Sequence, residues 1–206
     1  MAGMTRPAEG TSARLSLRDR NRLRTRRELL DAALEVFAES GYGSATVENI
    51  AARAGASKVT LYNYFPQGRE ELFRDLYEEI NTELIDTAST IYGRDGDFGS
   101  RVVALTEALV EIAQRPLVGR FYSIDDPALD EALNPVRGHA SRVLGDLISN
   151  DFAAARKKRA VKQKVPAEAM GELLVGAMRS ALSSVAEGRL KPTEIIVAMR
   201  TLVDGL

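Results

Sequence analysis

Apolar residues recur at helical spacing along most of the chain, and alternation typical of strands never extends beyond a few residues. The first helical pattern runs from about Arg22 to Ser40–Gly41, and its apolar face carries Leu30, Ala33, Leu34 and Phe37. Two short helices follow, capped by Thr46 and Ser57. Longer ones are predicted over 69–88, 98–113, 116–123, 135–152, 166–187 and from 192 onward, with breaks at Gly and Pro. The pattern therefore predicts an all-α fold of about nine helices.

Composition narrows the class of protein. Of the 206 residues, 45% are hydrophobic and 28% charged, which is ordinary for a globular chain. No apolar run is long enough to span a bilayer, and the Arg-rich N-terminus lacks the apolar core of a secretory signal, so we expect a cytoplasmic protein. The absence of cysteine excludes disulfides and thiolate metal sites, and a single histidine, His139, argues against His-based catalysis. We therefore expect neither a cofactor nor a metal site, and no enzymatic activity.

Charge is unevenly distributed along the chain. Residues 1–27 contain eight arginines and only two acidic residues, whereas residues 70–206 carry a net negative charge. A basic N-terminal part followed by an acidic remainder is typical of a protein whose N-terminal part binds a polyanion. A charged, disordered N-terminal segment that binds nothing has the same composition. We divide the chain into a disordered basic arm (1–20), a helical head (21–68) and a helical body (69–206).

The segment 46–65, TVENIAARAGASKVTLYNYF, carries the strongest functional signal. Its two short helices meet at Ala54–Gly55–Ala56, where glycine permits a tight turn and small residues permit a close crossing. Ile50, Ala51 and Ala54 are expected to face inward from the first helix, and Val59, Leu61 and Tyr64 are candidates from the second. The polar positions left on the second helix are Ser57, Lys58, Thr60, Tyr62 and Asn63. This is the arrangement of a helix-turn-helix unit, although helix pairs of this length also occur without DNA binding.

The segment 25–73 resembles the N-terminal domain of the TetR/AcrR family of transcriptional regulators. The matching positions include Arg26, Leu30, Ala32–Ala33, Phe37, Gly41–Tyr42, Thr46–Val47, Ile50–Ala51, Ala54–Gly55, Ser57, Leu61–Tyr62, Tyr64–Phe65 and Leu72. The resemblance implies an all-α homodimer with a three-helix DNA-binding head and a ligand-binding, dimerising body. It also implies a near-palindromic double-stranded operator, because two identical reading helices lie about 34–36 Å apart.

The resemblance further implies roles for individual residues. Thr46 would contact a phosphate, Ser57, Lys58 and Thr60 would face base edges, and Val59 would meet a thymine methyl group. Tyr62 and Tyr64 would reach phosphates, Asn63 belongs to the same exposed face, and an arm with Arg22, Arg24 and Arg26 would follow the backbone or a minor groove. The link Phe65–Pro66–Gln67–Gly68–Arg69 is one residue longer than is usual in the family, and Arg69 replaces the usual lysine; Arg69 is still expected to neutralise a phosphate at the start of its helix.

The body is interpreted from its pattern. The segment 166–187 is apolar or small nearly all round, so it must be covered on both sides. With the last helix it predicts a four-helix dimer interface, unless both helices simply fill the core of one subunit; the interface candidates are Leu174, Ala177, Met178, Ala181, Ile196, Met199 and Val203. A cavity for a small lipophilic effector would be lined by Leu105, Leu109, Phe121, Tyr122, Val143, Leu147 and Phe152, each of which is also an ordinary core residue.

Two clusters of charged residues can each be explained either by a function or by ordinary solvent exposure. Asp125, Asp126, Asp130 and Glu131 near His139 would suit a hard cation, and with it a metal-dependent enzyme, but acidic residues at a solvated helix start are the simpler explanation. The run Arg156–Arg159 with Lys162 and Lys164 would bind nucleic acid, or it is a solvated cluster at a helix end.

Taken together, these features predict a dimeric repressor that a small effector releases from DNA by shifting the spacing of its two heads. Repression rather than activation is an implication of the resemblance. The alternatives are a DNA-binding regulator without a small-molecule ligand and, more remotely, the metal-dependent enzyme.

Overall fold

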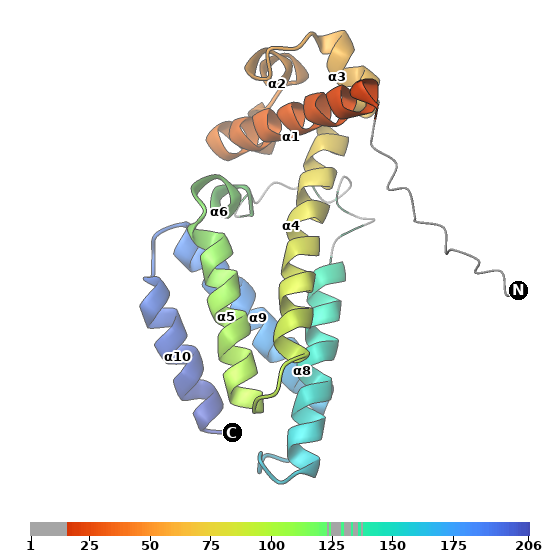
Figure 1. Ribbon diagram of the computed structural model, residues 1–206. Helices are drawn as coiled ribbons and strands as arrows, with labels where there is room; N and C mark the ends of the chain where they lie inside the picture. Colours follow the sequence, from red (N-terminus) through yellow and green to blue (C-terminus); the bar gives the residue numbers. More distant parts are fainter. Residues whose placement is uncertain (1–15, 123, 125–128, 130–132, 134–135, 137) are drawn as a thin grey trace, which may run out of the picture.

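The computed structural model describes residues 16–122, 124, 129, 133, 136 and 138–206 (Figure 1). Its helices are α1 (Leu17–Ser44), α2 (Val47–Arg53), α3 (Lys58–Tyr64), α4 (Arg69–Tyr92), α5 (Phe98–Gln114), α6 (Pro116–Tyr122), α8 (His139–Lys157), α9 (Ala167–Ala186) and α10 (Pro192–Asp204). No strand occurs in this part of the chain, so the prediction of an all-α fold with about nine helices is confirmed. None of the described helices is long and apolar enough to cross a bilayer.

The first helix begins earlier than predicted. The Ser16 side chain caps α1 by accepting a hydrogen bond from the Asp19 backbone N–H at 3.1 Å. Residues 17–20 are therefore helical, which corrects their assignment to a disordered arm; residues 1–15 of that arm lie outside the described residues. The sequence pattern missed these turns because they are exposed on all sides and show no apolar period. The predicted stop is present at Gly41, whose φ of 75° interrupts the regular helix.

An aromatic cluster joins the head to the body. Phe37 of α1 packs edge-to-face against Phe73 of α4, with ring centroids 5.0 Å apart. Phe73 in turn lies 4.4 Å from Phe121 of α6, and all three rings are buried. α4 continues from this cluster far into the body (Figure 1), so one helix contacts both parts of the chain.

The body is built around the close packing of α8 on α9. At the crossing, a Cβ atom added to Gly171 would lie 2.7 Å from the carbonyl oxygen of Gly145 and 2.2 Å from the Ser149 Oγ. Only glycine at position 171 therefore permits this separation of the two backbones. α5 packs against α9, and α10 covers the other side of α5.

Candidate nucleic-acid interface

The helix-turn-helix unit forms as the sequence predicts. Thr46 accepts a hydrogen bond from the Asn49 N–H at 3.2 Å and caps α2, while Ser57 accepts one from the Thr60 N–H at 3.0 Å and caps α3. Gly55 takes a φ of 65° in the turn between them. The tilt of α3 is thus set by local hydrogen bonds and a tight turn.

The inner face of the unit matches the prediction with one exception. Ile50, Ala51 and Leu61 are buried, and Ala54 and Tyr64 are half-buried. Val59, also a candidate for the inner face, is 70% exposed, because two helical residues before Leu61 place it on the opposite side of α3. A β-branched residue exposed in this way has no partner within the head, which suits the alternative role of contacting a thymine methyl group.

The outer face of α3 is open to solvent. Lys58, Val59, Tyr62 and Asn63 are exposed along its length. Ser57 and Thr60 are less available, because their side chains lie 2.9 Å apart and hydrogen-bond to each other in addition to capping the helix. The DNA contacts of Thr46, Ser57, Thr60 and Tyr64 remain predictions.

Lys58 forms an ion pair across the unit in the free protein. Its Nζ contacts the Glu48 carboxylate of α2, and the ammonium lies 6.0 Å from the centroid of the Tyr62 ring. The hydrogen bond raises the pKa of Lys58 and lowers the pKa of Glu48, so both groups are charged at neutral pH. Lys58 must therefore exchange one anionic partner for another when it meets a phosphate or a base edge.

This exchange leads to a prediction for Glu48→Gln. The variant should bind DNA more tightly, by up to about fivefold at low salt, because it removes a competing surface ion pair and one repulsive charge. The melting temperature should be almost unchanged. The matched control is Glu39→Gln, which removes an equally exposed carboxylate that pairs with Arg53 away from α3. A gain of equal size in the control, or none in Glu48→Gln, would show that Glu48 does not compete with DNA; fluorescence anisotropy measures both.

In the free protein Arg69 is engaged within the head, and the phosphate contact predicted for it stays a prediction. Its Nη1 donates hydrogen bonds to the carbonyl oxygens of Tyr42, Gly43 and Ala45 at 3.1 to 3.3 Å. The guanidinium also lies 4.6 Å from the centroid of the Tyr42 ring. Gly68, directly before Arg69, adopts a φ of 65° and lies close to the Tyr62 ring, so the chain enters α4 through a turn that favours glycine.

The arginines of α1 divide into two groups. Arg22 and Arg24 are exposed, and Arg24 makes a long contact of 3.7 Å to Glu28, so both remain candidates for the DNA backbone. Arg26 instead contacts Asp75 of α4 at 2.5 Å and lies over the Phe65 ring. In the free protein this contact links α1 to α4, and the contact predicted between Arg26 and the DNA backbone stays a prediction. Arg27 reinforces the link by contacting Glu79 of α4 at 2.5 Å.

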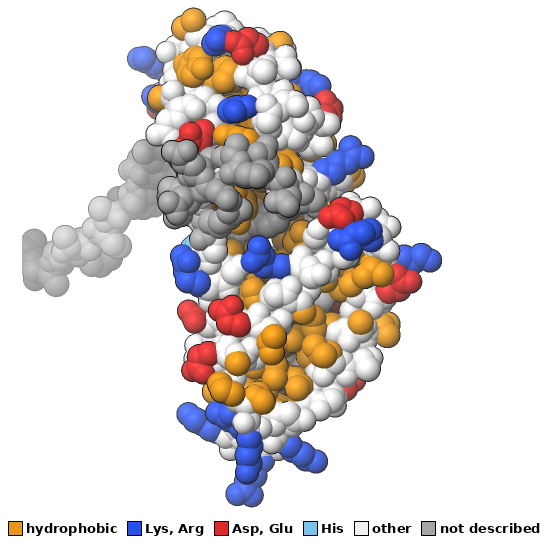
Figure 2. All heavy atoms as spheres, turned by 180° about the vertical axis from the view of Figure 1, so that it is seen from behind, with side chains coloured by type: hydrophobic (Ala, Val, Ile, Leu, Met, Phe, Trp, Pro, Cys, Tyr) orange, Lys and Arg blue, Asp and Glu red, His pale blue; other side chains and the backbone are white. Residues whose placement is uncertain are grey.

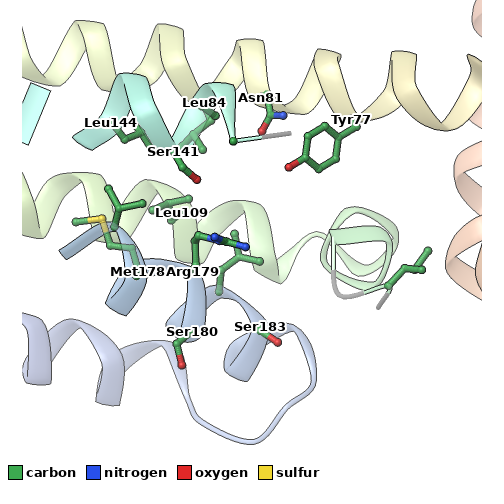
Figure 3. A pocket seen from close by; sticks show the side chains of 16 residues that line it. Tyr77, Asn81, Leu84, Leu109, Ser141, Leu144, Met178, Arg179, Ser180 and Ser183 are labelled. Carbon is green, nitrogen blue, oxygen red and sulfur yellow. The ribbon is translucent and has the colours of Figure 1, made fainter. Parts of the chain in front are cut away.

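A cavity of about 470 Å³ lies in the body between α4, α5, α8 and α9 (Figure 3). Its apolar lining includes Leu84, Leu109, Leu144 and Met178. The polar lining consists of Tyr77 and Asn81 from α4, Ser141 from α8 and, from α9, Arg179, Ser180 and Ser183. No carboxylate of the described residues forms an ion pair with Arg179. The cavity can therefore hold an amphipathic molecule of moderate size.

Of the residues predicted to line a cavity, Leu109 alone is among those around this one. Leu105, Phe121 and Phe152 are buried in close packing instead, Phe121 in the aromatic cluster and Phe152 edge-to-face with Phe98 at 5.3 Å. Val143 and Leu147 are half-buried outside the cavity, and the side chain of Tyr122 lies outside the described residues. The polar residues of α4 and α9 were missed because a search for apolar positions passes over them.

Most residues predicted for the dimer interface are buried within the subunit. Leu174, Met178, Ala181, Met199 and Val203 are each less than 10% exposed in the single chain, which corrects their assignment to a surface between subunits. Ile196 is half-buried and Ala177 is exposed. The exposed apolar side chains of these helices lie on their outer faces, at Leu173, Val197 and Leu202.

The acidic cluster cannot be placed, because Asp125, Asp126, Asp130 and Glu131 lie outside the described residues. His139 is exposed at the start of α8. Among the residues that are described, no group of three His, Cys, Asp or Glu side chains is arranged to hold a metal ion.

Comparison with known proteins places the head in a family. Residues 29–76 match the family described as bacterial regulatory proteins, tetR family. The fatty acid metabolism regulator protein of Bacillus subtilis is 37% identical over 59 residues, which cover 29% of this chain and 30% of that relative. The HTH-type transcriptional repressor LfrR of Mycolicibacterium smegmatis is 28% identical over 66% of this chain and 81% of its own length.

Solved structures extend the likeness to the body. The transcriptional regulator FadR of Bacillus subtilis, crystallised in complex with stearoyl-CoA, superposes with a TM-score of 0.71 over 85% of this chain and 96% of its own. Its sequence identity is 16%, so this likeness concerns the fold alone. The head, residues 29–76, therefore matches the tetR family of bacterial regulatory proteins by sequence, and it stands on a body that shares the fold of a solved transcriptional regulator.

Proposed function

We propose that the protein is a dimeric cytoplasmic regulator of transcription, rather than an enzyme, that binds a near-palindromic operator in double-stranded DNA. The observation that carries the proposal is the exposed face of α3, where Lys58, Val59, Tyr62 and Asn63 lie on a helix held rigidly by α2. A short helix with an open polar face is the element that enters a major groove in this type of unit. Arg22 and Arg24 of α1 supply further cations for the phosphate backbone.

The second subunit fits the outer faces of α9 and α10. Leu173, Val197 and Leu202 are 71%, 64% and 53% exposed, and Figure 2 shows hydrophobic side chains gathered over this part of the body. Beside Leu173, the small residues Gly176 and Ala177 permit close approach of a second helix. An exposed apolar face of this kind is typical of a subunit interface.

The effector site is the cavity lined by α4, α5, α8 and α9. Apolar side chains share the lining with Arg179 and several hydroxyl groups, which are spread around the cavity, so we infer a lipophilic effector that also carries polar or anionic groups. The stearoyl-CoA complex of the structurally similar FadR supports a ligand of this class. A regulator without a small-molecule ligand is the alternative, and mass spectrometry of material co-purified with the protein distinguishes the two.

We infer that α4 couples the cavity to the head. α4 contributes Tyr77, Asn81 and Leu84 to the cavity wall, and the same helix holds Asp75 and Glu79 against arginines of α1. An effector that binds one position of α4 better than another shifts the population between two spacings of the heads. We infer that the bound spacing no longer fits adjacent major grooves, which makes the protein a repressor released by its effector.

The test is selection of genomic fragments with the purified protein. We expect the recovered fragments to share a near-palindrome whose half-sites are centred about 10–10.5 base pairs apart, or a multiple of that distance. Fragments that share no site, or a single unrepeated half-site, would contradict the dimeric regulator.

A further inference from the structure

A dense group of cations lies at the end of the body farthest from the helix-turn-helix unit. It comprises six residues, which we call the basic pole: Arg156, Lys157, Lys158, Arg159, Lys162 and Lys164. The segment 156–164 contains no acidic residue, and no described carboxylate forms an ion pair with any of the six. Figure 2 shows Lys and Arg side chains extending together from this end of the molecule. The proposed DNA-binding function does not use them.

The basic pole is held on an ordered scaffold. Val161 is buried, and the backbone N–H of Lys162 donates to the carbonyl oxygen of Leu206 at 3.2 Å. The Gln163 amide donates to the carbonyl oxygen of Gly205 at 2.9 Å, and Arg156 donates to that of Val165 at 2.8 Å. The side chains of Lys158, Lys162 and Lys164 are left exposed. The cations are therefore presented from fixed backbone positions.

Arg159 occupies a position where glycine is the favoured residue. Its φ of 58° is left-handed, and the Ala160 N–H donates to the Ala155 carbonyl oxygen at 2.9 Å in the closing turn of α8. Among the described residues other than glycine, no other has a positive φ. A side chain in this conformation destabilises the fold relative to glycine, so the stability of the turn does not explain an arginine here.

The dipole of α8 explains only part of the cluster. Arg156 and Lys157 lie in the last helical turn, where cations stabilise the helix end. Lys162 and Lys164 lie beyond the helix, where that effect has faded, and mutual repulsion opposes gathering them beside the others. A concentration of unpaired cations that neither the helix end nor the turn requires points to an external polyanion.

We propose that the basic pole binds the phosphate backbone of a second DNA duplex without sequence preference, so that an operator-bound protein bridges two DNA segments. The bridging rests on the proposed function, because the heads must hold the first duplex. Duplex DNA is favoured over a membrane surface because Val161 is buried and only Val165, 38% exposed, offers lipid a large apolar side chain within 156–165, which is too little to anchor the pole in a bilayer. Binding through phosphates alone is independent of sequence and strongly dependent on salt.

The test uses the full-length protein on bead-tethered operator DNA and measures capture of a second, fluorescent duplex that lacks the operator. We expect capture at 50 mM salt and its loss at 200 mM salt. The double variant Lys157→Gln/Lys158→Gln should reduce capture at least about tenfold and lower the salt slope by about 2, while its binding to the operator stays the same. The matched control, Arg142→Gln/Lys191→Gln, removes two exposed cations elsewhere on the body and should capture the second duplex like the wild type.

The variant Arg159→Gly distinguishes a role of Arg159 in DNA binding from a role in the stability of the turn. Glycine relieves the left-handed conformation, so the melting temperature should rise by about 2–4 °C while capture of the second duplex falls. A purely structural arginine would change the melting temperature alone. Capture that is equal in the wild type, Arg159→Gly and the double variant, or lost equally in the control, would overturn the proposal.

Two further experiments distinguish DNA binding by the basic pole from operator binding by the head and from membrane binding. The first uses the variant Lys58→Ala/Tyr62→Ala, whose head is impaired. Fluorescence anisotropy should still detect its weak binding to a random-sequence duplex, and adding Lys157→Gln/Lys158→Gln should remove that binding. This result supports the basic pole even if no operator exists. Flotation with vesicles containing phosphatidylserine should show no binding that competes with the duplex. If the basic pole binds vesicles and the protein does not capture a second duplex, the partner of the pole is a membrane rather than DNA, and the proposal is refuted.

Discussion

Lys58→Ala and Tyr62→Ala should each weaken binding to the operator roughly tenfold or more without changing the dimer or its melting temperature. Lys58 is exposed at the start of α3 and pairs only with an exposed carboxylate among the described residues, so its loss leaves the core intact. Tyr62 lies one turn further along the same face and is 41% exposed. Both side chains project where a major groove would lie, and gel-shift titration at fixed salt measures each loss.

The control for these variants is Arg94→Ala, which removes an exposed cation from the loop between α4 and α5, far from the head. It should bind the operator like the wild type. If Lys58→Ala and Tyr62→Ala also bind with unchanged affinity, α3 is not the reading helix. If all three weaken equally, the effect reflects total charge rather than contact.

Gly171→Ala should destabilise the protein by about 1–3 kcal/mol, lowering the melting temperature by several degrees. The added methyl group would lie 2.7 Å from the Gly145 carbonyl oxygen, which belongs to the backbone and cannot rotate away. α8 and α9 must therefore move apart, at the crossing that supports both the cavity wall and the proposed dimer face. Thermal unfolding followed by circular dichroism measures the change.

The matched control is Gly145→Ala, on the facing helix at the same crossing. A Cβ atom there has no heavy atom within 4 Å, so the variant should be as stable as the wild type or slightly more stable, because alanine favours the helix. If Gly171→Ala is as stable as the wild type, the two helices can separate at this point without cost. The close crossing would then not determine how the body packs.

The head could be predicted from the sequence because its determinants are local. Thr46 and Ser57 cap helices that begin at the next residue, and Gly55 lies in the turn between them. Each signal acts within a few residues along the chain, which is where pattern analysis is most reliable. Val59 was ambiguous because a seven-residue helix has too few positions to fix which side is buried.

Contacts between distant segments escaped prediction for a physical reason. Arg69 donates to carbonyl groups that precede it by more than twenty residues, and Arg26 contacts Asp75 on another helix. Neither partner is encoded near the residue itself. The residues predicted for the dimer interface were misassigned for another reason. α9 is apolar or small nearly all round, so the spacing of its apolar residues does not indicate which side packs against the subunit's own core.

The cavity could not be located from the sequence because a void is a property of packing. Leu105 and Leu109 lie one turn apart on the same helix, yet only Leu109 borders the space. Which apolar side chain lines a void depends on how neighbouring helices cross, and Tyr77, Asn81 and Arg179 complete the wall from two other helices.

The most direct test of the account is a crosslink from the centre of the α3 face. A photo-reactive amino acid is placed at Val59 and, in a second protein, at Leu173, which is equally exposed on α9. Irradiation on the recovered operator should attach position 59 to one base in each half-site, and position 173 to the other subunit but not to DNA. Failure of position 59 to reach DNA while the operator is bound would contradict the claim that α3 enters the duplex.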